Sequence, residues 1–141
     1  ILDIAEWLGV PYLEGQGLFK LPVGRRPNNS KPIVYVIYTT HGWTNSRLMG
    51  GKAINLHRLS DIVLADVYMI GHTHTPMAFS DSYYVPDLRN NKVDERVRYY
   101  VNTGSYQKRS VYPITKGMRP VALVRPVVVL SGNQRKVEVR L

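Results

Sequence analysis

The chain has 141 residues, 44% of them hydrophobic and ten of them tyrosine, which is enough for one packed domain spanning residues 1–141 and argues against disorder. It has no cysteine, which excludes disulfides, thiolate metal sites and a thiol nucleophile, and no apolar run of about 18 residues, so we expect a cytoplasmic protein without a membrane span. The formal charge of +9 favours polyanionic partners such as nucleic acid or phosphorylated substrates, although a merely basic surface gives the same count.

Helix and strand signals alternate in the first half of the chain. Apolar residues at helical spacing in 1–8, with Gly9 as the stop, predict that the sequence opens inside an amphipathic helix. A continuous run of β-branched and aromatic residues at 33–38 predicts a strand that is buried on both faces. The other elements of this half are expected to be a strand at 17–23, a helix at 52–63 and a strand at 66–70.

The second half of the chain is rich in strand signals. Strands are expected over 97–102, 120–130 and 135–141, and the turn residues 131–134 predict a hairpin between the last two. A strand–helix–strand unit followed by a β meander predicts a mixed α/β fold around at least one sheet.

Three of the four histidines stand where buried strands are predicted to end. His41 follows the first of these strands, while His72 and His74 follow the second in the stretch "GHTHTP". A strand–helix–strand unit of this length returns the chain beside its first strand, so these histidines are expected at one sheet edge. In extended backbone, residues 72 and 74 would also point to the same side. Three imidazoles can bind Zn²⁺, Mn²⁺ or Fe²⁺, whereas separate strand-end histidines would have no such role.

Three short sequence words carry a resemblance to a known family. They are "YTTHGW" (38–43), "GHTHTP" (71–76) and "VNTGS" (101–105), and together they resemble the C-terminal half of the calcineurin-like metallophosphoesterases, in particular the phage and bacterial type. The resemblance implies a two-sheet β-sandwich flanked by helices, here incomplete because the N-terminal half is lacking. It also implies a metal-dependent phosphoesterase that hydrolyses phosphomono- or diesters at a dinuclear metal site.

The resemblance also implies roles for individual residues. His41 and His72 would bind one metal ion and His74 the other, with Mn²⁺ favoured, although Zn²⁺ or Fe²⁺ could occupy the same ligands. The glycines beside them would let a phosphate come close, and Trp43 would either line the substrate approach or cover the core. From their positions next to the histidines or in a neighbouring loop, we expect Gly42, Gly71, Trp43 and Ser105 to contact the substrate.

The family motifs that come before the His-Gly word have no counterpart in this sequence. They supply an Asp-x-His, a metal-bridging Asp and an Asn-His whose histidine is the catalytic acid. The six aspartates do not replace them, because residues 61 and 66 flank the predicted helix end and residues 81, 87 and 94 follow in turn-like context. We therefore expect no catalytic residue in this chain, which alone would be inactive until the N-terminal half of the same domain completes the site.

Two other functions are compatible with the sequence. The chain could be a non-catalytic basic module that binds nucleic acid with at most one structural metal, or a mononuclear three-histidine zinc hydrolase. Residues 24–31 and 105–113 are basic stretches that could contact phosphate or a nucleic-acid strand. A solvated hairpin loop and a loop with packed tyrosines are the respective alternatives. His57, inside the predicted helix, has no expected ligand role.

Overall fold

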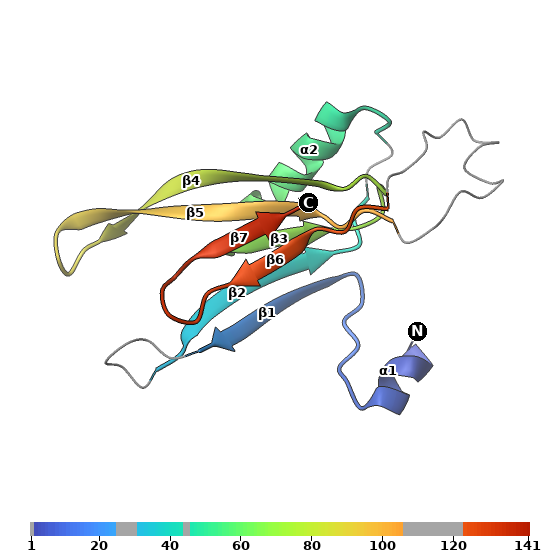
Figure 1. Cartoon of the computed structure of the whole chain (residues 1–141), viewed down its shortest axis with the longest axis horizontal. Coiled ribbons are helices and arrows are strands. Elements are labelled where there is room, and N and C mark those ends of the chain that lie inside the picture. Colours follow the sequence, from blue (N-terminus) through green and yellow to red (C-terminus); the bar gives the residue numbers. More distant parts are fainter. Residues whose placement is uncertain (1, 25–30, 44–45, 106–122) are drawn as a thin grey trace.

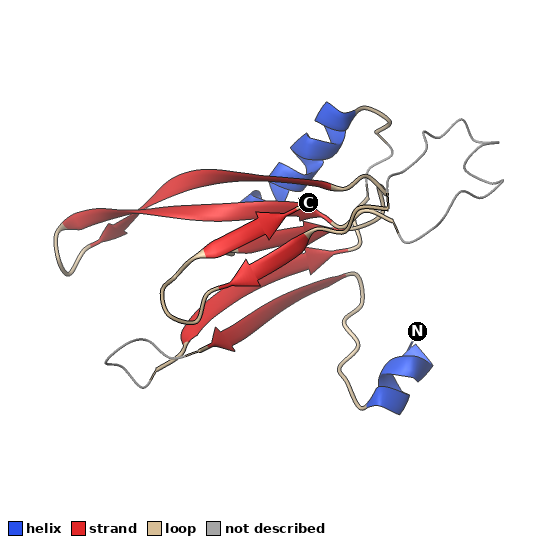
Figure 2. Cartoon of the chain, in the orientation of Figure 1, coloured by secondary structure: helices blue, strands red, loops and turns tan. Residues whose placement is uncertain are grey.

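The computed structural model describes residues 2–24, 31–43, 46–105 and 123–141 of the chain (Figure 1). Seven strands and few helices make it a mixed α/β fold in which strands dominate this described part (Figure 2). The elements in chain order are α1 Leu2–Leu8, β1 Gln16–Val23, β2 Ile33–Thr40, α2 Met49–His57, the 3₁₀ turn η1 Arg58–Asp61, β3 Val67–Ile70, β4 Met77–Asp87, β5 Lys92–Asn102, β6 Val127–Leu130 and β7 Val137–Arg140.

Five strands form a mixed sheet in the order β1-β2-β3-β5-β4. The three central strands, β2, β3 and β5, run parallel, while β1 and β4 pair antiparallel at the two edges. The central strands end level with one another, since Thr40 faces Ile70 and Ile70 faces Asn102. The carboxyl ends of all three therefore meet at one edge of the sheet, where ligands bind in open α/β sheets.

The two faces of this sheet are covered differently. The β6–β7 hairpin packs on one face, where Ile33, Tyr35 and Val67 of the sheet contact Val137. The Tyr35 hydroxyl fixes the hairpin by donating to the Ser131 carbonyl at 2.7 Å. Helix α2 and η1 cover the opposite face, where their buried residues Leu56 and Leu59 pack on a cluster of stacked aromatic rings from the sheet, namely Tyr68, Tyr100 and Phe79.

The predicted strand–helix–strand unit is confirmed, because β2, α2 and β3 follow in order and β2 pairs parallel with β3. The predicted helix is shorter than expected, since α2 ends at His57 and continues as η1. The final hairpin is confirmed, although β6 begins only at Val127; residues 123–126 are loop, and 120–122 lie outside the described residues. No helix in the described ranges is long and apolar enough to cross a membrane.

Strand β4 is not among the strands predicted from the sequence. Residues 81 and 87 lie in β4 and residue 94 lies in β5, so their expected turn-like context is wrong. The polar residues and Pro86 of this stretch are tolerated because β4 is an edge strand, which leaves one side of its backbone unpaired. Strands β4 and β5 extend well past the rest of the sheet as a two-stranded ribbon (Figure 1).

Candidate metal centre

His41 and His72 lie in contact at the carboxyl ends of the parallel strands. His41 directly follows Thr40, the last residue of β2, and His72 comes two residues after Ile70, the last of β3. Their rings meet edge to face with centroids 5.1 Å apart, and the His72 Nδ1 is 3.2 Å from the His41 Nε2. The expectation that the strand–helix–strand unit brings these two histidines together is therefore met.

Gly42 permits this close approach of the strand ends. Gly42 has a φ of +94°, and a Cβ at that position would lie 2.7 Å from Cγ1 of Ile70, so a side chain would be both strained and obstructed. A Cβ on Gly71 would lie 3.4 Å from the His41 carbonyl oxygen, and its amide donates to the Thr40 carbonyl at 3.3 Å. Glycine is therefore required at residue 42, whereas a side chain at residue 71 would make an ordinary van der Waals contact.

The backbone that carries His72 and His74 is not extended. Both residues have positive φ, at +62° and +55°, and the Thr73 amide donates to the Gly71 carbonyl at 2.6 Å across His72. This hydrogen bond and φ describe a tight γ-turn centred on His72. The expectation that residues 72 and 74 share one side through strand alternation is therefore wrong, because alternation requires extended backbone.

The His41–His72 pair has the spacing of two ligands to one metal ion. Two nitrogens at the usual distance of about 2.0–2.1 Å from a tetrahedral zinc are about 3.3 Å apart, close to the 3.2 Å observed between the two rings. Within the described ranges, no group of three or more histidine, aspartate or glutamate side chains is placed to hold a metal ion. The described residues therefore hold two imidazoles at a spacing compatible with one metal ion, and ligation by His41, His72 and His74 stays a prediction.

Several aspartates are engaged away from this edge of the sheet. Asp66 precedes β3, at the end of that strand opposite to His72, where it pairs with Arg135 and accepts the Val36 amide at 2.8 Å. Asp87 accepts the backbone amides of the β4–β5 turn, and hydrogen bonds from that turn hold the pKa of its carboxyl below the usual value. Asp94 pairs with Lys92 at 2.9 Å.

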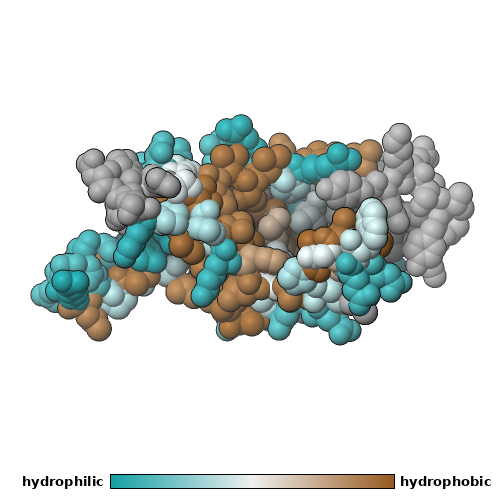
Figure 3. Space-filling view, turned by 90° about the horizontal axis from the view of Figure 1, so that it is seen from below, coloured by the Kyte–Doolittle hydropathy of each residue, from teal (hydrophilic) through white to brown (hydrophobic). Residues whose placement is uncertain are grey.

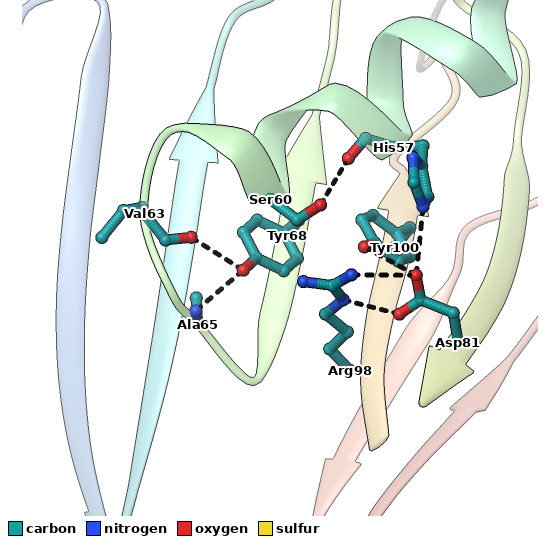
Figure 4. A network of polar contacts seen from close by, with 8 residues as sticks. All are labelled: His57, Ser60, Val63, Ala65, Tyr68, Asp81, Arg98 and Tyr100. Carbon is teal, nitrogen blue, oxygen red and sulfur yellow. Dashed lines mark hydrogen bonds and ion pairs between the residues drawn. The ribbon is translucent and has the colours of Figure 1, made fainter. Parts of the chain in front are cut away.

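A second polar cluster, which we call the Asp81 network, lies beneath α2 (Figure 4). The Asp81 carboxylate accepts from Arg98 Nε at 2.6 Å and Nη2 at 3.2 Å, and from the Tyr100 hydroxyl at 3.2 Å. His57, at the end of α2, lies 3.0 Å from the same carboxylate, with its ring 5.2 Å from that of Tyr100. The network therefore ties the helix to strands β4 and β5.

The environment of the Asp81 network shifts the pKa values of its members. Burial acts to raise the pKa of Asp81, but hydrogen bonds from Arg98 and His57 outweigh it and hold that pKa below the usual 3.8. Burial raises the pKa of Tyr100 to about 12 and also raises that of Tyr68, so both phenols stay protonated. The carboxylate of Asp81 is consequently charged at neutral pH and is committed to structural donors.

The other two predicted substrate contacts, Trp43 and Ser105, differ in their exposure. Trp43, two residues after His41 in the chain, is exposed, whereas Ser105 is buried, with 7% of its surface accessible. The roles of both in substrate binding stay predictions. Most of the two basic stretches, residues 25–30 and 106–113, lies outside the described residues.

Comparison with known proteins identifies no relative. No family model, no curated protein and no solved structure matches the chain. Assignment of a function therefore depends on the histidine pair and on its surroundings.

Proposed function

We propose that this chain supplies the histidine half of the dinuclear metal site of a phosphoesterase of the calcineurin-like type. The observation that carries the proposal is the His41–His72 pair, whose ring nitrogens are 3.2 Å apart where two parallel strands end. In this proposal the pair binds one divalent ion, and His74 binds the second ion. Mn²⁺ is favoured because an oxygen-rich and histidine ligand mixture suits it, with Zn²⁺ and Fe²⁺ as alternatives.

The proposal assigns the bridging carboxylate and the catalytic acid to a polypeptide outside these 141 residues. One support is chemical, since Asp66, Asp81, Asp87 and Asp94 all have hydrogen-bonding or ionic partners of their own. A second support is the edge strand β1, which among the described residues pairs only with β2 and leaves Leu18, Phe19 and Leu21 between 39% and 48% exposed. Hydrophobic residues gather in the middle of the side seen in Figure 3, between hydrophilic groups. Apolar area of this kind marks an interaction surface.

The chemistry assigned to the site is hydrolysis of a phosphomono- or diester. When bound, divalent ions polarise phosphoryl oxygens and favour ionisation of water at neutral pH. Without an ion, the 3.2 Å nitrogen separation lets one ring donate a hydrogen bond to the other, and that proton leaves when both nitrogens bind a metal ion. The net charge of +9 favours a polyanionic substrate such as nucleic acid.

Turnover of bis(p-nitrophenyl) phosphate in Mn²⁺ tests the proposal. The assay compares the 141-residue chain with the product of the full open reading frame that encodes it, each alongside His72→Ala and the control His57→Ala. We expect no turnover from the 141-residue chain, and turnover from the full product that is lost in His72→Ala and retained in His57→Ala. Robust turnover by the 141-residue chain would overturn the proposal that this chain supplies only half of the site. A product of the full open reading frame that binds metal but has no turnover would overturn the assignment as a phosphoesterase.

A second candidate is a basic nucleic-acid-binding module without catalysis. The excess of 19 Lys and Arg over ten Asp and Glu favours it. Such a module should bind single-stranded DNA with an affinity that falls steeply with salt. If that affinity is unchanged in His41→Ala and no preparation hydrolyses the ester, the binding module is the better description.

A further inference from the structure

The loop between β3 and β4, residues 71–76, holds an unusual backbone. Left-handed φ values are uncommon for residues other than glycine, yet two histidines of this short loop, His72 and His74, adopt them. Such conformations persist where surrounding contacts fix them, and they concentrate at functional sites. The contacts that fix this loop converge on Thr73, the residue between the two histidines.

Two residues from different elements hold Thr73. Asn102, the last residue of β5, is fully buried and donates its Nδ2 hydrogen to the Thr73 hydroxyl oxygen. Lys52, in the first half of α2, donates from Nζ to the Thr73 carbonyl at 3.2 Å and to the Thr75 hydroxyl at 2.5 Å. The Thr75 hydroxyl in turn donates to the Thr73 carbonyl at 3.1 Å. The side chain and the carbonyl of Thr73 are thus each anchored.

We propose that Lys52 and Asn102 are positioning residues, which hold Thr73 so that the γ-turn keeps the His72 ring against His41. This inference deepens the proposed function, because it takes the histidine pair as the metal site. Partners one step removed from the metal set ligand orientation in metal sites generally. Lys52 contacts the loop at Thr73 and Thr75, and Asn102 contacts it at Thr73, so we expect each to act on His72 through the loop.

The direction in which Lys52→Met changes metal affinity separates a positioning role of Lys52 from a purely electrostatic one. The Lys52 ammonium is a positive charge near the proposed cation site, so its removal should tighten metal binding if charge were its only effect. If Lys52 positions His72, the substitution Lys52→Met should instead weaken Co²⁺ binding by about 10-fold or more. The matched control is Lys92→Met, which removes the same charge at the tip of the β4–β5 ribbon, roughly 30 Å along β5 from Asn102.

The experiment measures Co²⁺ affinity and, without metal, the nuclear Overhauser effect between the ring protons of His41 and His72. It uses the whole chain and Lys52→Met, Lys92→Met and Thr73→Val, each checked for folding by near-ultraviolet circular dichroism. We expect Lys52→Met and Thr73→Val to lose the ring contact and to bind Co²⁺ more weakly, while Lys92→Met retains both properties. Thr73→Val serves as a second variant because it removes the acceptor of Asn102 and leaves that residue in place.

Failure of this inference is distinguishable from failure of the proposed function. If the unsubstituted chain binds no Co²⁺, the assignment of a metal site is wrong. The positioning role still holds in that case if Lys52→Met loses the contact between the two histidine rings and Lys92→Met keeps it. If Lys52→Met keeps the ring contact and binds Co²⁺ as tightly as before or more tightly, the positioning role is overturned.

Discussion

The Asp81 network should contribute measurably to stability, and Asp81→Ala tests how much. The substitution removes the common acceptor of Arg98, whose two nitrogens lie at 2.6 and 3.2 Å, and of the Tyr100 hydroxyl at 3.2 Å. The Asp81 and Arg98 side chains are 30% and 18% exposed, so the pair lies between a surface ion pair and a buried one. Removing one member of a buried pair costs about 3–5 kcal/mol, whereas surface pairs contribute about 0–1 kcal/mol.

We therefore expect Asp81→Ala to lower the free energy of unfolding by about 2–3 kcal/mol, measured by urea denaturation at neutral pH. Asp94→Ala is the matched control, because it breaks an ion pair on the same ribbon whose side chains are 55% and 42% exposed. That control should lose less than about 1 kcal/mol. The double variant Asp81→Ala with Arg98→Met should recover part of the loss, since it leaves no charge unpaired. If Asp81→Ala lowers the free energy of unfolding no more than Asp94→Ala does, the Asp81 network does not stabilise the fold as proposed.

Three further predictions concern Gly42, Tyr35 and the pH dependence that Asp81 gives to stability. Gly42→Ala should lower the free energy of unfolding by about 1–3 kcal/mol, because φ there is +94° and the added Cβ would meet β3 at 2.7 Å; unchanged stability in urea would contradict this. Tyr35→Phe should cost about 1–2 kcal/mol and speed hydrogen exchange at the Lys136 amide, which donates to the Tyr35 hydroxyl at 3.0 Å; unaltered exchange would count against it. Because the folded-state pKa of Asp81 is depressed, its contribution is complete above pH 3.8 and is lost as the pH falls towards the lower folded-state value. Asp81→Asn should flatten this acid limb of the stability curve, and an unchanged limb would contradict the assignment.

The central part of the fold could be predicted from the sequence because its signals are strong. The continuous apolar run of β2 and the helical periodicity that follows allow only one common arrangement, a crossover that returns the chain to a parallel neighbour. That topology was sufficient to place His41 beside His72. Strand β4 gave a weaker signal, because Ser, Asp and Pro residues interrupt its apolar side chains and an edge strand tolerates them.

Two features of the candidate site could not be predicted from residue spacing. Positive φ at His72 and His74 depends on Lys52 and Asn102, which are 21 and 29 residues away from their partner Thr73 in the sequence. His57 meets Asp81 across 24 residues and two different elements, and no local pattern links a helix end to an edge strand. Such contacts follow from packing of the helix on the sheet.

The assignment of His41 and His72 to a metal site is tested by metal stoichiometry on the 141-residue chain at equilibrium. A Co²⁺ titration followed by visible absorption would be combined with elemental analysis of the His41→Ala, His72→Ala and His57→Ala variants. We predict that one ion binds, that either His41→Ala or His72→Ala abolishes its binding, and that His57→Ala leaves the stoichiometry unchanged. Binding that survives both His41→Ala and His72→Ala, or no binding to the unsubstituted chain, would contradict the assignment of this pair as half of a metal site.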